Sequence, residues 1–105
     1  MTERDYEIAR KLKRRWSERV PVVEMRVFGS RARGDNESDS DMDVFIEIER
    51  HTREIEEIVR DIAWETGLEY FIHVSPLIFS RDDVENSPMR SSPILGNVRK
   101  EGVMV

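Results

Sequence analysis

The 105-residue sequence contains no cysteine, so it has neither a disulfide framework nor a thiolate metal site. No apolar run approaches the roughly 18 residues of a membrane-spanning helix, and no N-terminal apolar segment resembles a signal peptide. There are only five glycines and four prolines, and the sequence contains no linker-like stretch and no internal repeat. These absences predict a single domain over residues 1–105, located in the cytoplasm and not in a membrane.

The charge of the chain is acidic overall but unevenly distributed. The net charge is −5, although residues 1–20 carry seven Lys or Arg against four Asp or Glu. Because non-specific affinity for nucleic acid comes mainly from neutralised phosphates, this balance argues against a nucleic-acid partner. The basic N-terminal segment is interpreted either as a solvated helix face or as a docking surface for an acidic partner.

Apolar periodicity in the first half predicts a helix, two strands and a connecting loop. A helix is predicted over residues 2–19, followed by a strand over residues 23–27 in which apolar and charged residues alternate. Residues 29–34 read as a short turn or helical segment, and residues 35–40 as an exposed loop. The next strand, over residues 43–48, presents two sets of side chains to opposite sides, namely Val44, Ile46 and Ile48 against Asp43, Phe45 and Glu47.

In the second half, the spacing predicts a helix capped by Thr52 that ends at Gly67. An apolar strand is predicted over residues 68–79, where Pro76 indicates an edge position or a bulge. Short helices complete the chain. This order of elements predicts an α+β fold, an α/β sandwich in which a small mixed sheet is covered by helices on one face.

Two carboxylates are the leading candidates for catalysis. Asp41 and Asp43 are two residues apart, so on an extended strand they project from the same face with Cα atoms roughly 6.5 Å apart. Carboxylate oxygens suit Mg²⁺ or Mn²⁺, which proteins usually hold through one or two carboxylates together with substrate phosphates. We therefore expect Asp41 and Asp43 to bind a divalent metal ion and to act as the catalytic pair.

A phosphate-binding turn is expected just before this pair. Gly29 lets the backbone approach a phosphate closely, and the amides that open the next turn, together with the Ser30 hydroxyl, supply hydrogen-bond donors. Arg31, Arg33 and Ser40 are further nucleotide-binding candidates. Alternatively, the two arginines form surface ion pairs with the acidic loop, and the sequence leaves this choice open.

Gly-Ser-Arg-Ala-Arg-Gly at residues 29–34, followed by Ser-Asp-Met-Asp-Val at residues 40–44, resembles the signature of the polymerase-β-like nucleotidyltransferase superfamily, and in particular of its minimal branch. The resemblance covers essentially the whole chain and implies a nucleotidyltransferase fold. It also implies two magnesium ions on the Asp-x-Asp pair and usually a third carboxylate on a later strand. Here that strand has no acid after Glu69, and Ser75 or His73 takes the position.

Two side-chain environments are also predicted. On an apolar strand, His73 is more readily interpreted as a satisfied core histidine than as a ligand or base. Trp16 and Trp64 both lie at helical positions and are expected in the core.

The resemblance implies an enzyme that transfers a nucleoside monophosphate, AMP from ATP, to an acceptor hydroxyl. Minimal members are commonly paired with a helical HEPN-domain protein, and some act as antitoxins by adding AMP to a tyrosine of that toxin. The missing third carboxylate gives one alternative, a weak or inactive module that neutralises a HEPN partner by binding alone. A nucleotide sensor that binds without reacting is a further alternative.

Overall fold

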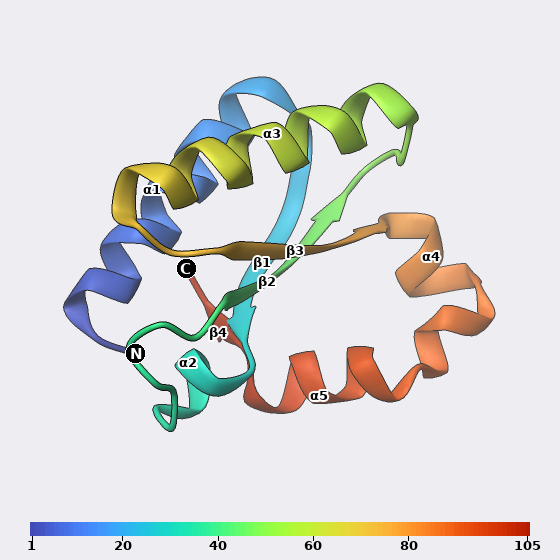
Figure 1. The fold of residues 1–105 in the computed structure, drawn as a ribbon. Helices are drawn as coiled ribbons and strands as arrows, with labels where there is room; N and C mark the ends of the chain where they lie inside the picture. The colour runs from blue at the N-terminus through green and yellow to red at the C-terminus, as the bar shows by residue number, and fades with distance from the viewer.

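A four-stranded mixed sheet forms the centre of the computed structural model, which describes residues 1–105 (Figure 1). Its strands lie in the order β3-β2-β1-β4, with β2 antiparallel to β1 and parallel to β3, and β4 antiparallel to β1. The strands are β1 (Val22–Phe28), β2 (Met42–Ile48), β3 (Val74–Ser80) and β4 (Val103–Met104). The predicted α+β class with a small mixed sheet is confirmed.

The helices lie on both sides of this sheet, so the prediction that they cover one face only is wrong. Figure 1 shows α1 and α3 on one side and α4 and α5 on the other. The helices are α1 (Glu3–Arg19), α2 (Ser30–Arg33), α3 (Arg53–Tyr70), α4 (Arg81–Asn86), the 3-10 helix η1 (Pro88–Ser91) and α5 (Pro93–Glu101). Thr2 and Thr52 cap α1 and α3, as their positions predict. None of the helices combines the length and apolarity needed to span a bilayer.

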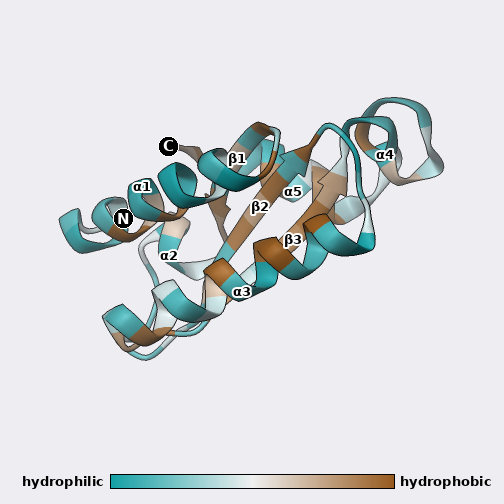
Figure 2. Cartoon of the chain, turned by 90° about the horizontal axis from the view of Figure 1, so that it is seen from above, coloured by the Kyte–Doolittle hydropathy of each residue, from teal (hydrophilic) through white to brown (hydrophobic).

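The main core lies between the sheet and the pair α1 and α3. Val44, Ile46 and Ile48 of β2 are fully buried there, because alternate residues of a strand point to the same face. Figure 2 shows the contrast between the largely hydrophobic strand β2 and the hydrophilic outer turns of α1. The amphipathic pattern of the sequence therefore accounts for this layer.

A second, smaller cluster lies on the opposite face of the sheet. Phe45 of β2 and Phe79 of β3 are buried there, with ring centroids 5.9 Å apart. Val84 of α4 and Leu95 and Val98 of α5 complete the cluster. The helices thus cover part of the second face as well as the first.

The end of α3 differs from the prediction. The helix continues through Gly67 to Tyr70 and ends at Phe71, which adopts a left-handed conformation with φ of 58°. Gly67 is required for close packing instead, since a Cβ there would lie 2.5 Å from the carbonyl oxygen of Ile72. The predicted start of the third strand at residue 68 is therefore wrong, and β3 begins at Val74.

The two tryptophans also separate. Trp16 is fully buried, and its indole N–H donates a 3.0 Å hydrogen bond to the carbonyl oxygen of Val59. Trp64 is 61% exposed, which overturns the expectation that it lies in the core. Helical periodicity placed Trp64 near the apolar stripe of α3. The side chain instead faces outward, beside the start of β3.

Candidate functional site

The start of β2 brings two carboxylates to the second face of the sheet. Met42, between Asp41 and Asp43, is fully buried in the main core, so the aspartates on either side of it point the other way. The Asp41 side chain is 56% exposed, and Asp43 is half-buried. Asp43 pairs with Phe28 of β1. The structure thus places the two carboxylates on one face, as strand alternation predicts.

The carboxylates of Asp41 and Asp43 repel each other. Burial raises the pKa of the Asp43 carboxyl above its ordinary value, and the neighbouring Asp41 carboxylate raises it further. The positive charge of Arg33 and the nearby His73 oppose these effects on the pKa of Asp43. A cation bound between the carboxylates would relieve the same repulsion.

The turn between β1 and α2 lies directly against Asp43. Gly29 has a φ of +74°, which favours glycine, and a Cβ at this position would lie 2.5 Å from Oδ2 of Asp43. Ser30 then begins α2, which is a single turn closed by a 3.1 Å bond from the Arg33 amide to the Gly29 carbonyl oxygen. Only a residue without a side chain fits between the turn and the carboxylate.

The Arg31 side chain supports the loop and is buried. Its guanidinium forms a 2.8 Å ion pair with Asp5 of α1 and donates hydrogen bonds to the carbonyl oxygens of Ser38 and Ser40. This guanidinium is therefore not available to a nucleotide, which corrects the expectation for Arg31. Sequence reasoning missed Asp5, although its position three residues after Thr2 marks it as the partner in a capping box.

Arg33 and Ser40 lie around the site with partners of their own. The Arg33 guanidinium pairs with Asp35 at 3.1 Å and with Glu101 at 3.4 Å, while its charge still acts on Asp43. The Ser40 hydroxyl accepts a 3.0 Å hydrogen bond from the amide of Glu37. Ion pairing is thus the observed state of Arg33, and nucleotide contacts from Arg33 and Ser40 stay predictions.

The strand beside the carboxylates carries no third acid. Ser75 of β3 is the register partner of Asp43, so the two side chains share one face. His73 precedes the strand, and its Nδ1 lies 3.3 Å from Oδ2 of Asp41. With its side chain 57% exposed, His73 is not the core histidine that was expected. No group of three or more His, Cys, Asp or Glu side chains is arranged to hold a metal ion.

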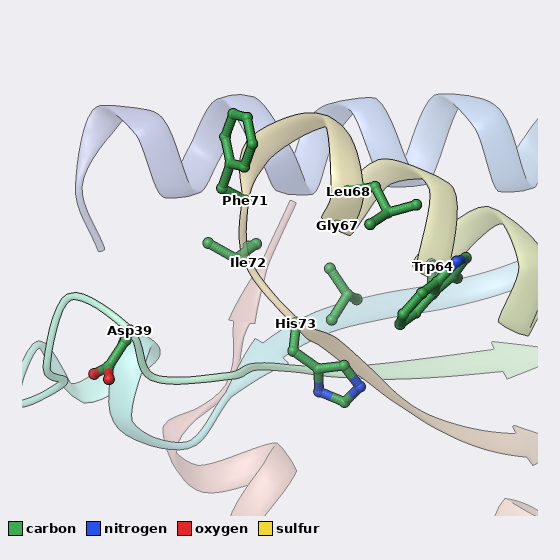
Figure 3. Close-up of a pocket in the computed structure, with 9 residues that line it drawn as sticks. Asp39, Trp64, Gly67, Leu68, Phe71, Ile72 and His73 are labelled. Carbon is green, nitrogen blue, oxygen red and sulfur yellow. The ribbon is translucent and has the colours of Figure 1, made fainter.

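An apolar pocket adjoins this histidine. It has a volume of about 350 Å³ and lies between the end of α3 and the start of β3. Figure 3 shows Trp64 and Leu68 of α3 beside His73, with Asp39 on the facing loop. Sequence reasoning missed this pocket, because residues 68–71 were interpreted as part of an apolar strand and not as the end of a helix.

Comparisons with known proteins identify the family and the fold. Residues 8–102 match the family described as the nucleotidyltransferase domain. The fold also matches a crystal structure of a Sulfolobus solfataricus protein that carries a provisional nucleotidyltransferase assignment, with a TM-score of 0.52 and 20% sequence identity. That match covers 93% of this chain and 76% of the other. No curated protein matches the sequence significantly.

Proposed function

Because this chain belongs to the nucleotidyltransferase domain family, we propose that it transfers AMP from ATP to a hydroxyl group of a protein partner. The observation that carries the proposal is the position of Asp43 directly against the Gly29 turn, with Asp41 on the same face just before β2. This arrangement combines a place for a cation with a backbone that a triphosphate can approach.

Asp41 and Asp43 are the residues that would hold Mg²⁺ or Mn²⁺. The fit rests on two oxygen donors on one face and on the repulsion between the two carboxylates, which Arg33 and His73 offset only in part. Triphosphate oxygens and water would complete the ligand set, as is usual for magnesium. When bound, such an ion neutralises the triphosphate and stabilises the departing pyrophosphate.

The other residues around the turn would orient the nucleotide. The Gly29–Ser30 backbone and the Ser30 hydroxyl would hold the β and γ phosphates, with Arg33 adding positive charge. The acceptor oxygen would then form a bond to the α phosphorus as the bond to pyrophosphate breaks. In this proposal the His73 imidazole, which lies 3.3 Å from Asp41, accepts the proton of the acceptor hydroxyl.

The proposed acceptor is a tyrosine of a HEPN-domain toxin, which would make this chain its antitoxin. Support comes from the apolar surface beside His73, where Trp64 is 61% and Phe71 93% exposed. Exposed aromatic residues of this size are enriched at protein interfaces, and this group lies next to the candidate base. A partner seated there would bring its own side chains to the Asp41 and Asp43 face.

The test purifies the chain together with the product of the adjacent gene, which this proposal expects to be the HEPN-domain partner. Incubation with magnesium and ATP labelled at the α phosphate should attach label to a tyrosine of the partner. Asp41→Asn should abolish the labelling, and His73→Asn should slow it by about 100-fold. A labelled small molecule with an unlabelled partner would contradict the choice of acceptor. The absence of any labelled product would contradict the proposed transferase activity.

One observation favours a second candidate function, in which the chain neutralises the partner by binding alone. Ser75, not an acid, is the register partner of Asp43, so the base and ligand usual in the family is missing. A toxicity assay separates the two functions. If Asp43→Asn still neutralises the partner as well as the wild-type chain does, binding is sufficient and transfer is not required.

A further inference from the structure

A glutamate without an ion-pair partner lies further along β2, on the same face as Asp43. Glu47 is only 7% exposed, yet none of the ion pairs in the structure includes it. Burial, and then the charge of Glu24, raise the pKa of its carboxyl above the ordinary value. The carboxylate oxygens are not sealed from solvent, so a ligand in the adjoining pocket can reach them.

Glu47 lines a pocket of about 420 Å³ between the sheet and helices α4 and α5. Phe45 forms part of its wall, together with Val84 of α4 and Leu95 and Val98 of α5. None of the candidate nucleotide-binding residues lines it. Four residues of extended strand separate Glu47 from Asp43, which corresponds to roughly 13 Å. The pocket is therefore separate from the nucleotidyltransferase site.

Of the carboxylates that line this pocket, Glu47 is the one that is neither ion-paired nor on the exposed surface. Glu24, the register partner of Glu47, is already engaged by Arg26 at 2.8 Å. Glu85 and Arg99 also line the pocket but are exposed, so water solvates their charges. Arg81 and Arg99 only partly offset the effects that raise the pKa of Glu47. The pocket thus joins an apolar wall to a charged rim in which the Glu47 carboxylate has no ion-pair partner.

We propose that this pocket binds a small organic cation, in which a primary ammonium or an amidinium group contacts the Glu47 carboxylate and an apolar body packs against Phe45 and Val98. Such a group brings both the positive charge and the N–H donors that the carboxylate lacks. The apolar walls favour a hydrophobic body over a bare inorganic ion, and the volume suits a single-ring compound.

Benzylamine is a suitable probe, with benzyl alcohol as its neutral counterpart of similar shape. Binding is followed through the backbone amide signals of ¹⁵N-labelled protein, without nucleotide or divalent metal. Benzylamine should shift the signals of residues around the pocket and bind about tenfold or more tightly than benzyl alcohol. Glu47→Gln, which keeps the side-chain shape, should weaken benzylamine binding by a similar factor, whereas Glu49→Gln, at an exposed position just after β2, should not.

Equal binding of the two probes would overturn the proposal, as would unchanged binding to Glu47→Gln or shifts confined to Asp41 and Asp43. An absence of benzylamine binding to the wild-type chain would also overturn it. The amide spectrum shows directly whether each variant is folded. Because no nucleotide is present, the result is independent of whether the chain transfers AMP.

Discussion

The two faces of strand β2 differ in the polarity of the side chains that they carry. On one face, Val44 and Ile46 are fully buried in a continuous apolar core under α1 and α3. On the other, Asp43 and Glu47 flank the single aromatic Phe45, and both carboxyl groups have raised pKa values caused first by burial. The first face stabilises the fold, while the second holds charges that the fold by itself would not favour.

This contrast explains how so small a chain can carry a reactive site. Alternation along one strand lets the core and the site occupy successive residues without competing for the same space. Stability should therefore respond mainly to changes on the core face, and activity mainly to changes on the other.

The largest expected effect is on activity. Asp43→Asn should lower nucleotidyl transfer by about 1000-fold, because it removes one of the two carboxylates proposed to hold the metal. The variant should remain folded, since Asn has the same shape. A radiolabel transfer assay measures the loss, with Asp61→Asn on exposed α3 as a control that should keep full activity. Near-normal transfer by Asp43→Asn would contradict the site.

On the core face, Ile46→Ala should lower the free energy of unfolding by about 3 kcal/mol, through lost burial and the cavity that remains. Urea denaturation measures the change. The control is Ile94→Ala on α5, where the side chain is 48% exposed and the expected loss is below about 1 kcal/mol. Similar losses for the two variants would contradict the assignment of the core to this face.

Two arginines on the same short helix provide a sharper comparison. Arg31→Met breaks the buried ion pair with Asp5 and should cost about 3 kcal/mol, because it leaves a buried carboxylate uncompensated. Arg33→Met removes only exposed pairs and should change stability by less than about 0.5 kcal/mol. Thermal unfolding of both variants measures which of them loses more stability. A larger loss for Arg33→Met would contradict our assignment of Arg31 as the residue that supports the loop.

The smallest effect concerns pH. The folded-state pKa of Asp43 is raised above the ordinary 3.8, so its charged form destabilises the fold at neutral pH, and this cost disappears as the pH falls through the raised value. Metal-free Asp43→Asn should therefore unfold up to about 4 °C higher than the wild-type chain at neutral pH. The difference should vanish in acid. Calorimetry at both pH values measures it, and a less stable variant at neutral pH would contradict the sign.

The sequence predicts the elements whose signals are local. The caps at Thr2 and Thr52, the alternation in β2 and the shared face of Asp41 and Asp43 all follow from spacing and side-chain chemistry. These features need only a few neighbouring residues, so their outcome does not depend on the rest of the fold. The family signature also predicts the functional class, and the match of residues 8–102 to the nucleotidyltransferase domain family supports it.

What the sequence does not reveal depends on contacts between distant segments. The bond between Arg31 and Asp5 joins residues 26 positions apart, and no local sequence pattern predicts that they pair. Gly67 looks like a helix terminator, yet it is needed for the close approach of Ile72. The two-residue strand β4 is too short to leave a periodic signal, and it forms only by pairing with β1.

The open edge of the sheet affects the behaviour of the protein at high concentration. The His73 carbonyl accepts a bond from the Met42 amide, so alternate residues of β3 bond to β2 and Pro76 turns its backbone toward the free edge. Proline has no amide hydrogen, so a strand from another molecule cannot complete a ladder there. At the opposite edge, β4 offers only two residues. Both borders therefore discourage aggregation by sheet extension.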